Sequence, residues 1–461
     1  MENEVLVRGR RGTYRDSFSK FRSNDRWLQA MRALAPRFPF HYGWAIVAAG
    51  VLANSATAGG TFWIVAVYIT AIADDFGAGR TAVVGAFMVG QVLFAVIGPW
   101  IGGAIDRGGA RSMLLVGSVA MPVALVATSF ATELWQLYAG WALVSLTRPL
   151  LMPIPYNWLI TRWFEGRGRQ MSLGLVTTGF AMGGAVVLPL LAWVESGGEW
   201  QAAMVGSGVL ILVLHGTAAL FVVADRPRDL GLRPSGSTAL VDVDVVEGGF
   251  SSSEALRSPV FWLVSLGLLL FFLGQGSVNN LIVDFFDSRG IAIGATLLAV
   301  TAWLRMLSRP PLSFVLLRVD RVFLLAMFVA LSQAVATGVL VVSTGDLGIG
   351  TWILFWGFGG AFAPMLEPLL ITRAFGVRHF GAISGLVAMI SFGGQVVGPI
   401  GGALLFDMTN SYEWPFSLYA AGFALAGLFW AVSSVLIRGA AHRKRAMRNG
   451  MLDEPEVAAA T

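Results

Sequence analysis

The sequence predicts an all-α polytopic membrane protein with twelve transmembrane helices in two pseudo-symmetric six-helix bundles. Three observations predict this fold class. Of the 461 residues, 56% are hydrophobic and 13% are charged, which is too little polar surface to coat a water-soluble globule of this size. Apolar runs long enough to cross a bilayer recur along the chain. The second half of the sequence also repeats part of the first.

The apolar runs divide the chain into two sets. Residues 1–40 are basic and have no apolar stretch typical of a cleavable signal peptide, so we expect a cytoplasmic arm. The N-terminal bundle, 41–224, has expected spans near 42–72, 81–104, 112–132, 134–161, 169–193 and 201–224. Residues 225–257 mix charge, Pro, Gly and Ser and are predicted as a central cytoplasmic loop. The C-terminal bundle, 258–437, has expected spans near 259–283, 293–317, 322–343, 349–374, 380–405 and 414–437. A cytoplasmic tail, 438–461, follows.

The distribution of charge predicts the orientation. With the loops numbered alternately, Arg80 and Arg289 are the basic residues expected outside. The acidic residues expected outside are Asp74, Asp75, Glu133, Glu195, Glu199, Asp284, Asp287, Asp346, Asp407 and Glu413. Since Lys and Arg collect on the cytoplasmic side of membrane proteins, we expect both termini in the cytoplasm of a bacterial-type plasma (inner) membrane. This placement explains the net charge of +5 without a nucleic-acid partner.

Several classes of chemistry are not supported by the sequence. The chain has no cysteine, and its four histidines are scattered without the spacing of metal ligands. No GxxxxGK[ST] motif indicates ATP binding. We therefore expect no enzyme activity, no cofactor and no metal. The paired glycines Gly59-Gly60 and Gly183-Gly184 are expected to allow close approach of helices rather than to bind phosphate.

The internal repeat has a displacement of 211 positions. It superposes Pro153 on Pro364, and Leu159-Ile160-Thr161-Arg162 on Leu370-Ile371-Thr372-Arg373. The match extends without a gap to Gly174-Leu175-Val176 and Gly385-Leu386-Val387. The fourth expected span then corresponds to the tenth, which predicts parallel repeats about an axis along the membrane normal, with a substrate between them at mid-depth.

The loop between the second and third spans carries a recognisable motif. Gly102, Asp106, Arg107, Gly109 and Arg111 resemble the major facilitator superfamily motif G-x-x-x-D-R-x-G-R-[RK], with Ala110 at one of the two closing basic positions. A degenerate second copy lies at Asp320-Arg321. Such a motif can lock helices through a carboxylate at a helix end and release them as the halves rock. The resemblance covers residues 41–437 and implies a transporter, with these residues in gating.

Within that superfamily the chain resembles the monocarboxylate and oxalate/formate transporter group. Tyr42-Gly43-Trp44 opens the first span, and Arg309-Pro310 lies in the eighth. The resemblance implies that the Arg309 guanidinium holds a substrate carboxylate. The sequence departs from that group at two positions. Members of the group have an acidic residue four positions before the arginine, and this chain has Arg305 there. They also have a lysine midway along the first span, and in this chain that lysine is replaced near Phe62.

Ionisable groups at bilayer depth are expensive and mark functional sites by default. Arg148, Arg305, Arg309 and Glu367 are such groups. Arg305 and Arg309 share one helix face and repel each other unless an anion lies between them. The alternatives are that Arg305 points elsewhere, pairs with Glu367 or contacts a carbonyl. Glu367 is a candidate proton carrier or a structural partner of an arginine.

Neutral polar residues extend the candidate substrate site. Gln275, Asn279 and Asn280 on the seventh span and Tyr156 on the fourth can offer hydrogen bonds at a cavity wall or join neighbouring helices. Pro310-Pro311 is expected to open a pocket or to kink the eighth span.

These features favour a secondary transporter of small organic anions, in particular monocarboxylates. We expect it to work by alternating access, with proton symport or anion exchange, as a monomer in the lipid bilayer. A major facilitator exporter of amphipathic compounds or drugs is the alternative, and a receptor-like sensor on a transporter fold is a third possibility.

Overall fold

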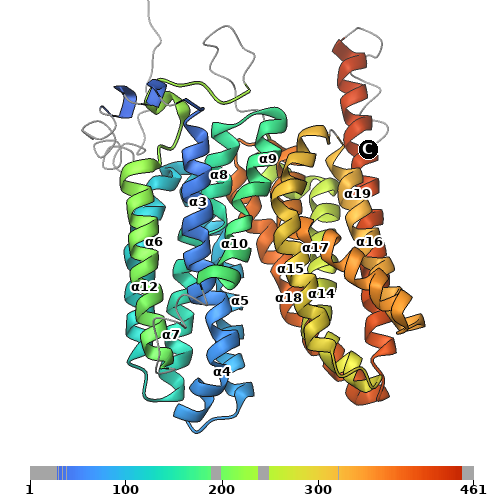
Figure 1. Ribbon diagram of the computed structural model, residues 1–461. Helices are drawn as coiled ribbons and strands as arrows, with labels where there is room; N and C mark the ends of the chain where they lie inside the picture. The colour runs from blue at the N-terminus through green and yellow to red at the C-terminus, as the bar shows by residue number, and fades with distance from the viewer. Residues whose placement is uncertain are drawn as a thin grey trace, which may run out of the picture.

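The computed structural model describes residues 29, 31–33, 35–37, 39–187, 199–236, 249–319 and 321–448. These residues are helical almost throughout and contain no β-strand, only two isolated bridges (Figure 1). The predicted fold class is confirmed: the chain is an all-α polytopic membrane protein.

The N-terminal helices follow the expected spans. The first crossing consists of α3 (Gly43–Ala58), η2 (Gly59–Trp63) and α4 (Ile64–Asp75). It is followed by α5 (Arg80–Gly108) and α6 (Ala110–Ser129). The fourth crossing consists of α7 (Leu134–Thr147), η3 (Arg148–Leu150) and α8 (Ile154–Trp163). Next come α9 (Gly166–Val176), α10 (Thr178–Met182), η4 (Gly183–Val187), α12 (Trp200–Thr217) and η5 (Ala218–Val222).

The C-terminal helices are longer and mostly unbroken. They begin with the short α13 (Ser252–Arg257) and continue with α14 (Pro259–Ser288), α15 (Gly294–Val315) and the 3-10 turn η7 (Leu316–Arg318). The remaining helices are α16 (Val322–Val342), α17 (Asp346–Phe375), α18 (Phe380–Thr409) and α19 (Glu413–Arg448). Two short 3-10 turns lie outside the two sets, η1 (Ala35–Arg37) and η6 (Pro227–Leu230).

Within the described residues, 10 stretches are long and apolar enough to cross a membrane. The two other predicted spans correspond to α7–η3–α8 and to α15, which pack against α5 and α17, respectively. The fourth crossing is interrupted at η3, and its longest helix, α7, has only 14 residues. In α15, the guanidinium groups of Arg305 and Arg309 lower the mean hydropathy of the segment.

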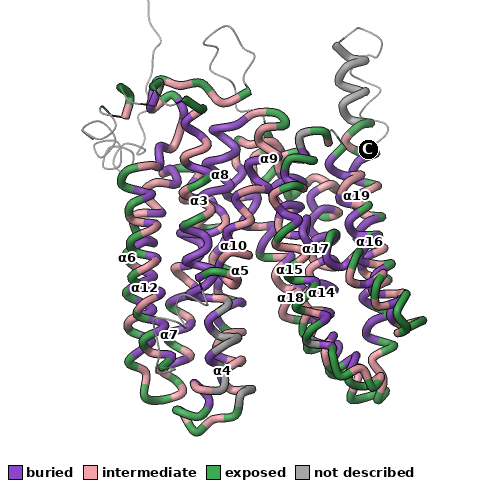
Figure 2. The backbone as a smooth tube through the Cα atoms, in the orientation of Figure 1, coloured by how far each residue is buried: buried purple, intermediate pink, exposed green. Residues whose placement is uncertain are grey.

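The outer surface of the helices is apolar, as contact with lipid requires. On α6, the exposed residues Val116, Val119 and Val123 follow a helical spacing on one face. Figure 2 shows exposed residues along the outer sides of the helices and buried residues between them. Hydrocarbon rather than water is the solvent that such a surface suits.

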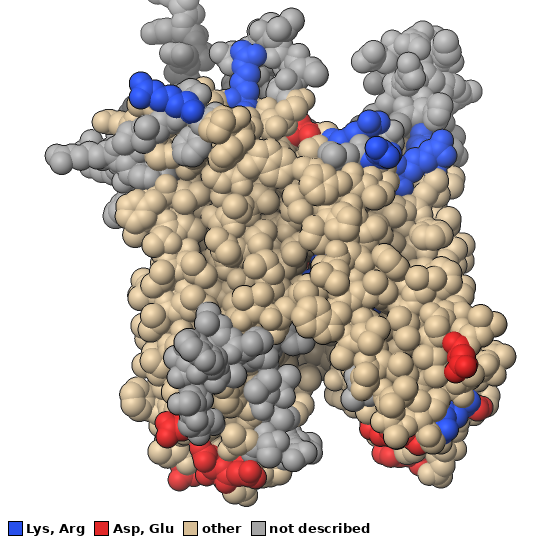
Figure 3. Space-filling view, in the orientation of Figure 1, with Lys and Arg blue, Asp and Glu red and all other residues tan. Residues whose placement is uncertain are grey.

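The helices form two groups, an N-terminal group from α3 to η5 and a C-terminal group from α14 to α19 (Figure 1). Figure 3 shows Lys and Arg gathered at one end of the molecule, and Asp and Glu at the other. We call these the basic end and the acidic end. The two groups are separated by a hollow at the acidic end in this view.

The two groups are in contact near the basic end, through α5 and α18 and through α9 and α15. A Cβ atom added to Gly385 on α18 would lie 2.5 Å from the carbonyl oxygen of Gly98 on α5, and Gly102 and Gly381 approach each other even more closely. On the other side, a Cβ at Gly174 on α9 would lie 2.7 Å from Oγ of Ser313 on α15. Gly174 and Gly385 are equivalent in the 211-residue repeat, so the repeat places a glycine at each contact.

Two π-helical turns, η2 and η4, pack against each other within the N-terminal group. A Cβ atom at Gly59 would lie 2.6 Å from Cγ1 of Val187, and one at Gly183 would lie 2.6 Å from the backbone nitrogen of Gly59. The expectation that the glycine pairs at these positions allow close approach of helices is therefore confirmed for Gly59 and Gly183.

We predict that Gly385→Ala will weaken the contact between the two groups at the basic end. The added methyl group meets backbone atoms of α5, which cannot rotate away. Overpacking costs about 1–3 kcal/mol, so the closed arrangement should lose population by about fivefold or more. The measurement is the rate of maleimide labelling at Ser313→Cys in detergent-purified protein, since the natural chain has no cysteine and Ser313 is fully buried.

Gly401→Ala is the matched control, because Gly401 lies on the same helix and its Cβ would meet no atom within 4 Å. Faster labelling in the Gly385→Ala background than in the Gly401→Ala background is the expected result. Equal rates in the two backgrounds would contradict the role of the glycine contact.

Candidate functional site

Arg309 lies on α15, which continues through Pro310 and Pro311 instead of ending there. The prolines lack the N–H groups that would bond the carbonyls of Met306 and Leu307, but they do not break the helix. The Arg309 side chain is 8% exposed. Its Nε and Nη1 atoms are buried and have no hydrogen-bond partner among the described residues. A buried guanidinium with two unused donor atoms is the most conspicuous polar feature of this helix.

Arg305 lies one turn away from Arg309, about 6 Å along the helix axis. Its Nε donates to the backbone carbonyl of Trp356 at 3.3 Å, and its guanidinium carbon lies 5.0 Å from the centre of the Trp356 ring. Its Nη2 atom is buried without a hydrogen-bond partner in the described part of the chain. Of the alternatives open for Arg305, contact with a carbonyl is therefore the one observed.

Gly360 on α17 makes room for the Arg305 guanidinium. A Cβ atom at this position would lie 2.5 Å from Nε and 2.7 Å from Cζ of Arg305. Any larger residue would push the guanidinium away from α17. Gly359-Gly360 is a further pair of glycines at a close approach, and here a side chain and not a helix backbone fills the space beside Gly360.

Arg148 lies in η3, where the fourth crossing is interrupted between α7 and α8. Its Nη2 donates to Oε1 of Gln91 at 2.5 Å, and its guanidinium carbon stands 3.9 Å from the centre of the Phe94 ring. Both partners belong to α5. The Phe94 ring in turn contacts Phe392 of α18, with ring centres 5.0 Å apart. Arg148 therefore lies close to the contact between the two helix groups, and its guanidinium is already engaged.

Glu367 lies on α17 and its Oε1 accepts a hydrogen bond from the hydroxyl of Ser384 on α18 at 3.1 Å. Within the described residues no ion pair joins Glu367 to an arginine. Ser384 is the neighbour of Gly385, which contacts α5. The carboxyl group of Glu367 thus lies beside α18, the helix that contacts α5 of the other group, and it is held there by a neutral hydroxyl.

The neutral candidates are not gathered around the arginines. Gln275 donates to Gln333 of α16, and Asn280 donates to the carbonyl of Gly276 in its own helix. Asn279 accepts a hydrogen bond from Nε1 of Trp356 at 3.3 Å, which places it near the ring that Arg305 contacts. Tyr156 is fully buried in the N-terminal group, where its ring contacts His215.

Among the motif residues, Asp106 bonds the two helix groups together at the basic end, a contact that we call the Asp106 lock. Asp106 accepts hydrogen bonds from the backbone N–H groups of Gly381 at 3.2 Å and Ala382 at 2.9 Å, at the start of α18, and from Nε1 of Trp158 at 2.9 Å. A carboxylate at a helix N-terminus is favourable because the first N–H groups have no helical partner. Trp158 carries no signal in the motif and was missed by sequence reasoning.

The other motif residues have different surroundings. The backbone N–H of Arg111 donates to Asp225 at 2.9 Å, and its Nε donates to the carbonyl of Ala219 at 2.9 Å. Gly109 has φ of 87°, and a Cβ there would collide with the Asp225 carboxylate. Arg107 and Arg321 are exposed, and Asp320 lies outside the described residues.

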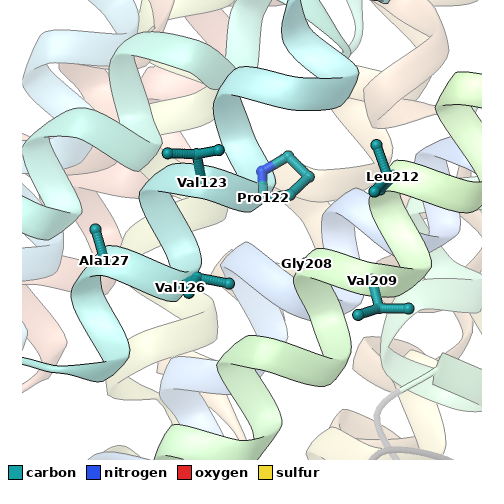
Figure 4. A pocket seen from close by; sticks show the side chains of 7 residues that line it. All are labelled: Pro122, Val123, Val126, Ala127, Gly208, Val209 and Leu212. Atoms are coloured by element: carbon teal, nitrogen blue, oxygen red, sulfur yellow. The ribbon is translucent and has the colours of Figure 1, made fainter.

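A separate pocket lies on the surface between α6 and α12 (Figure 4). Its lining is entirely apolar and consists of Pro122, Val123, Val126, Ala127, Gly208, Val209 and Leu212. Val123, Val209 and Leu212 are exposed on the lipid-facing surface. Without a polar group to orient a ligand, this pocket is not a candidate for the functional site.

Comparison with known proteins extends these observations. The chain is 23% identical to monocarboxylate transporter 4 of Rattus norvegicus, over 77% of this chain and 76% of that protein. It is 24% identical to the oxalate:formate antiporter of Oxalobacter formigenes, over 71% of this chain and 78% of that protein. Its fold is similar to that of the E. coli fucose:proton symporter FucP, with a TM-score of 0.62 at 14% identity, over 85% of this chain and 98% of that chain.

The sequence pattern that describes the Major Facilitator Superfamily matches residues 51–399, well over half of the chain. The match includes the motif around Asp106, both contacts between the helix groups, and all the buried arginines described above. With its apolar helices and its likeness to transporters of known structure, this chain is an integral membrane transporter that belongs to the Major Facilitator Superfamily.

Proposed function

We propose that this transporter moves small organic anions, in particular monocarboxylates, with Arg309 as the main anion-binding residue. The observation that carries the proposal is the buried Arg309 guanidinium, whose Nε and Nη1 have no hydrogen-bond partner among the described residues. A buried charge without partners is costly unless a ligand supplies them. A carboxylate accepts two parallel hydrogen bonds from a guanidinium, and it therefore gives Arg309 a charged partner for donor atoms that the protein leaves unbonded.

Arg305 supports the same proposal. Arg305 lies one turn from Arg309. Among the described residues, no acid forms an ion pair with either guanidinium. Two like charges at this spacing repel each other, and an anion between them turns the repulsion into attraction. The unused Nη2 of Arg305 can contribute to this attraction while its Nε stays on the Trp356 carbonyl.

The names of the relatives favour carboxylates among the possible anions. One similar protein is described as a monocarboxylate transporter and another as an oxalate:formate antiporter. Both substrate classes carry the group that a guanidinium binds best. We propose that the present chain also transports carboxylates and that it acts as a monomer.

The arrangement of the two helix groups supports alternating access as the mechanism. They are in contact at the basic end and separated by a hollow at the acidic end (Figure 3). Release of a substrate at the basic end requires that the glycine contacts and the Asp106 lock open. We propose residues 41–224 and 258–437 as the two moving bundles, on either side of the central loop 225–257.

We propose that Glu367 couples transport to protons. A carboxyl group between two helices, bonded to a hydroxyl and to no arginine, can gain or lose a proton without breaking an ion pair. It lies beside α18, whose contact with α5 must open and close during transport. Anion exchange is the competing mechanism, in which the arginines hold one anion at a time and Glu367 only joins α17 to α18.

We predict that both termini lie on the cytoplasmic side of the inner membrane. Lys and Arg gather at the basic end, and such residues collect on the cytoplasmic side of membrane proteins. A reporter that is active only in the periplasm should be inactive when fused to either terminus. The same reporter inserted at Ser343, between α16 and α17, should be active, since the acidic end would face the periplasm. Activity at the termini and none at Ser343 would reverse the proposed orientation.

Arg309→Lys is expected to reduce carboxylate uptake into proteoliposomes by about 10- to 100-fold, because a lysine keeps the charge but loses the two-pronged hydrogen bond to the substrate. Protein abundance should change little. The matched control is Arg257→Lys on α13, an exposed arginine outside the proposed site, which should transport normally. Normal transport kinetics in Arg309→Lys would remove Arg309 from the site.

Glu367→Gln should abolish accumulation driven by a pH gradient and preserve substrate counterflow, because an amide keeps the shape of the side chain but cannot release a proton. Glu413→Gln is the control, since Glu413 is an exposed carboxylate paired with Arg289 at 2.9 Å at the acidic end. Both assays use purified protein in proteoliposomes. Counterflow without pH-driven uptake in the wild type would refute proton coupling.

A further inference from the structure

A row of aromatic side chains crosses the N-terminal group of helices. Phe180 on α10 contacts Phe62 in η2, with ring centres 5.1 Å apart, and Phe62 contacts Phe87 on α5 at 5.9 Å. Phe87 meets Trp141 of α7 at 5.8 Å and 88°. We call Phe180, Phe62, Phe87 and Trp141 the aromatic row. Its members come from four different crossings, so the fold and not a local sequence motif assembles it.

The aromatic row lies at the depth of the arginines on α15. The α10 helix packs against α15. About one and a half turns before Phe180 in the sequence, Gly174 of α9 faces Ser313 of α15. Phe180 is about 9 Å beyond Gly174 towards the acidic end, by the rise of an α-helix. On α15, which runs in the opposite direction, Arg309 and Arg305 are about 6 and 12 Å beyond Ser313 in the same sense. Phe180 therefore stands level with the part of α15 between Arg309 and Arg305.

The three phenylalanines of the row are only half-buried, whereas Trp141 at its far end is 1% exposed. Packing in a closed core would bury the rings as completely as it buries Trp141. The partly exposed phenylalanines lie on α5 and α10, which are among the helices that contact the C-terminal group, and on η2. They thus offer an apolar, aromatic surface at the interface between the two groups.

The position of Arg148 adds a second constraint. Its guanidinium is bonded to Gln91 and lies over Phe94, one and two turns from Phe87 on α5 towards the basic end. Its charge is therefore partly used within the N-terminal group. Within the described part of the chain, a substrate with two carboxylates would find unbonded donor atoms on Arg305 and Arg309 but no comparable cation beside the aromatic row.

We infer that the preferred substrates are monocarboxylates with an aromatic ring, the carboxylate bound by Arg309 and Arg305 and the ring packed against Phe180 and Phe62. This inference rests on the proposed anion site and names the class of anion within it. Aromatic rings prefer edge-to-face or offset contacts with other rings, which a row of half-buried phenylalanines provides. A small hydroxy acid or a dicarboxylate makes none of these contacts.

The test compares 3-phenylpropionate with propionate, two monocarboxylates that differ only by the ring. Counterflow in proteoliposomes of the purified full-length chain gives KM for each without an imposed gradient. In the wild type, KM for 3-phenylpropionate should be lower than that for propionate by about tenfold or more, as expected for burial of one ring. Phe180→Leu and Phe62→Leu should each reduce this ratio by about threefold to tenfold and leave KM for propionate nearly unchanged.

Phe328→Leu is the matched control, because Phe328 on α16 is 64% exposed on the outer surface and should not alter the ratio. Propionate counterflow shows that each variant is folded. Equal KM values for the two acids in the wild type, or an equal loss of preference in all three variants, would overturn the inference and leave the anion site intact. Failure of both acids and of oxalate to show counterflow would overturn the anion site itself, and the inference with it.

Discussion

The cost of burying guanidinium groups at membrane depth constrains the whole arrangement. Each such group costs a few kcal/mol even after the helix adapts, so Arg148, Arg305 and Arg309 must face protein. Arg148 uses the carboxamide of Gln91 and the face of Phe94, and Arg305 uses a carbonyl and the ring of Trp356. Arg309 receives less than either, since two of its buried nitrogen atoms have no hydrogen-bond partner among the described residues. In the proposed mechanism, this is the charge that an anionic substrate completes.

The helices and the equivalence of the two halves could be predicted from the sequence. Composition and apolar runs predict the helices, because the bilayer allows few other structures, and the repeat predicts the equivalence of Gly174 and Gly385. The partners of the charged residues could not be predicted. Gln91 is 57 residues from Arg148, and Trp356 is 51 residues from Arg305, so only packing brings them together. The helix α15 continues through Pro310-Pro311, and the expectation that these prolines open a pocket or kink the helix stays a prediction.

If the substrate is an anion, as proposed above, the charges at the acidic end act on it before it is bound. Carboxylates around an entrance repel an approaching anion, and salt weakens this repulsion. The proposed arginine site must then overcome that repulsion, so its incomplete pairing is useful as well as costly. The carboxylate of Asp106 acts on the helices and not on the substrate, because N–H groups of α18 hold it at the basic end. In the proposed mechanism, acidic groups therefore act on the substrate at one end and on the helices at the other.

The π-helical turn at Gly59–Trp63 has a consequence for comparing this chain with its relatives. A π turn holds one residue more than an α turn, and one residue corresponds to a rotation of about 100° around the helix axis. Residues of α4 therefore face directions that the periodicity of α3 does not indicate. An ungapped alignment through this crossing would match inward-facing residues of one protein with sideways-facing residues of another. Substrate contacts transferred beyond Trp63 from a relative without the turn would be displaced by one position.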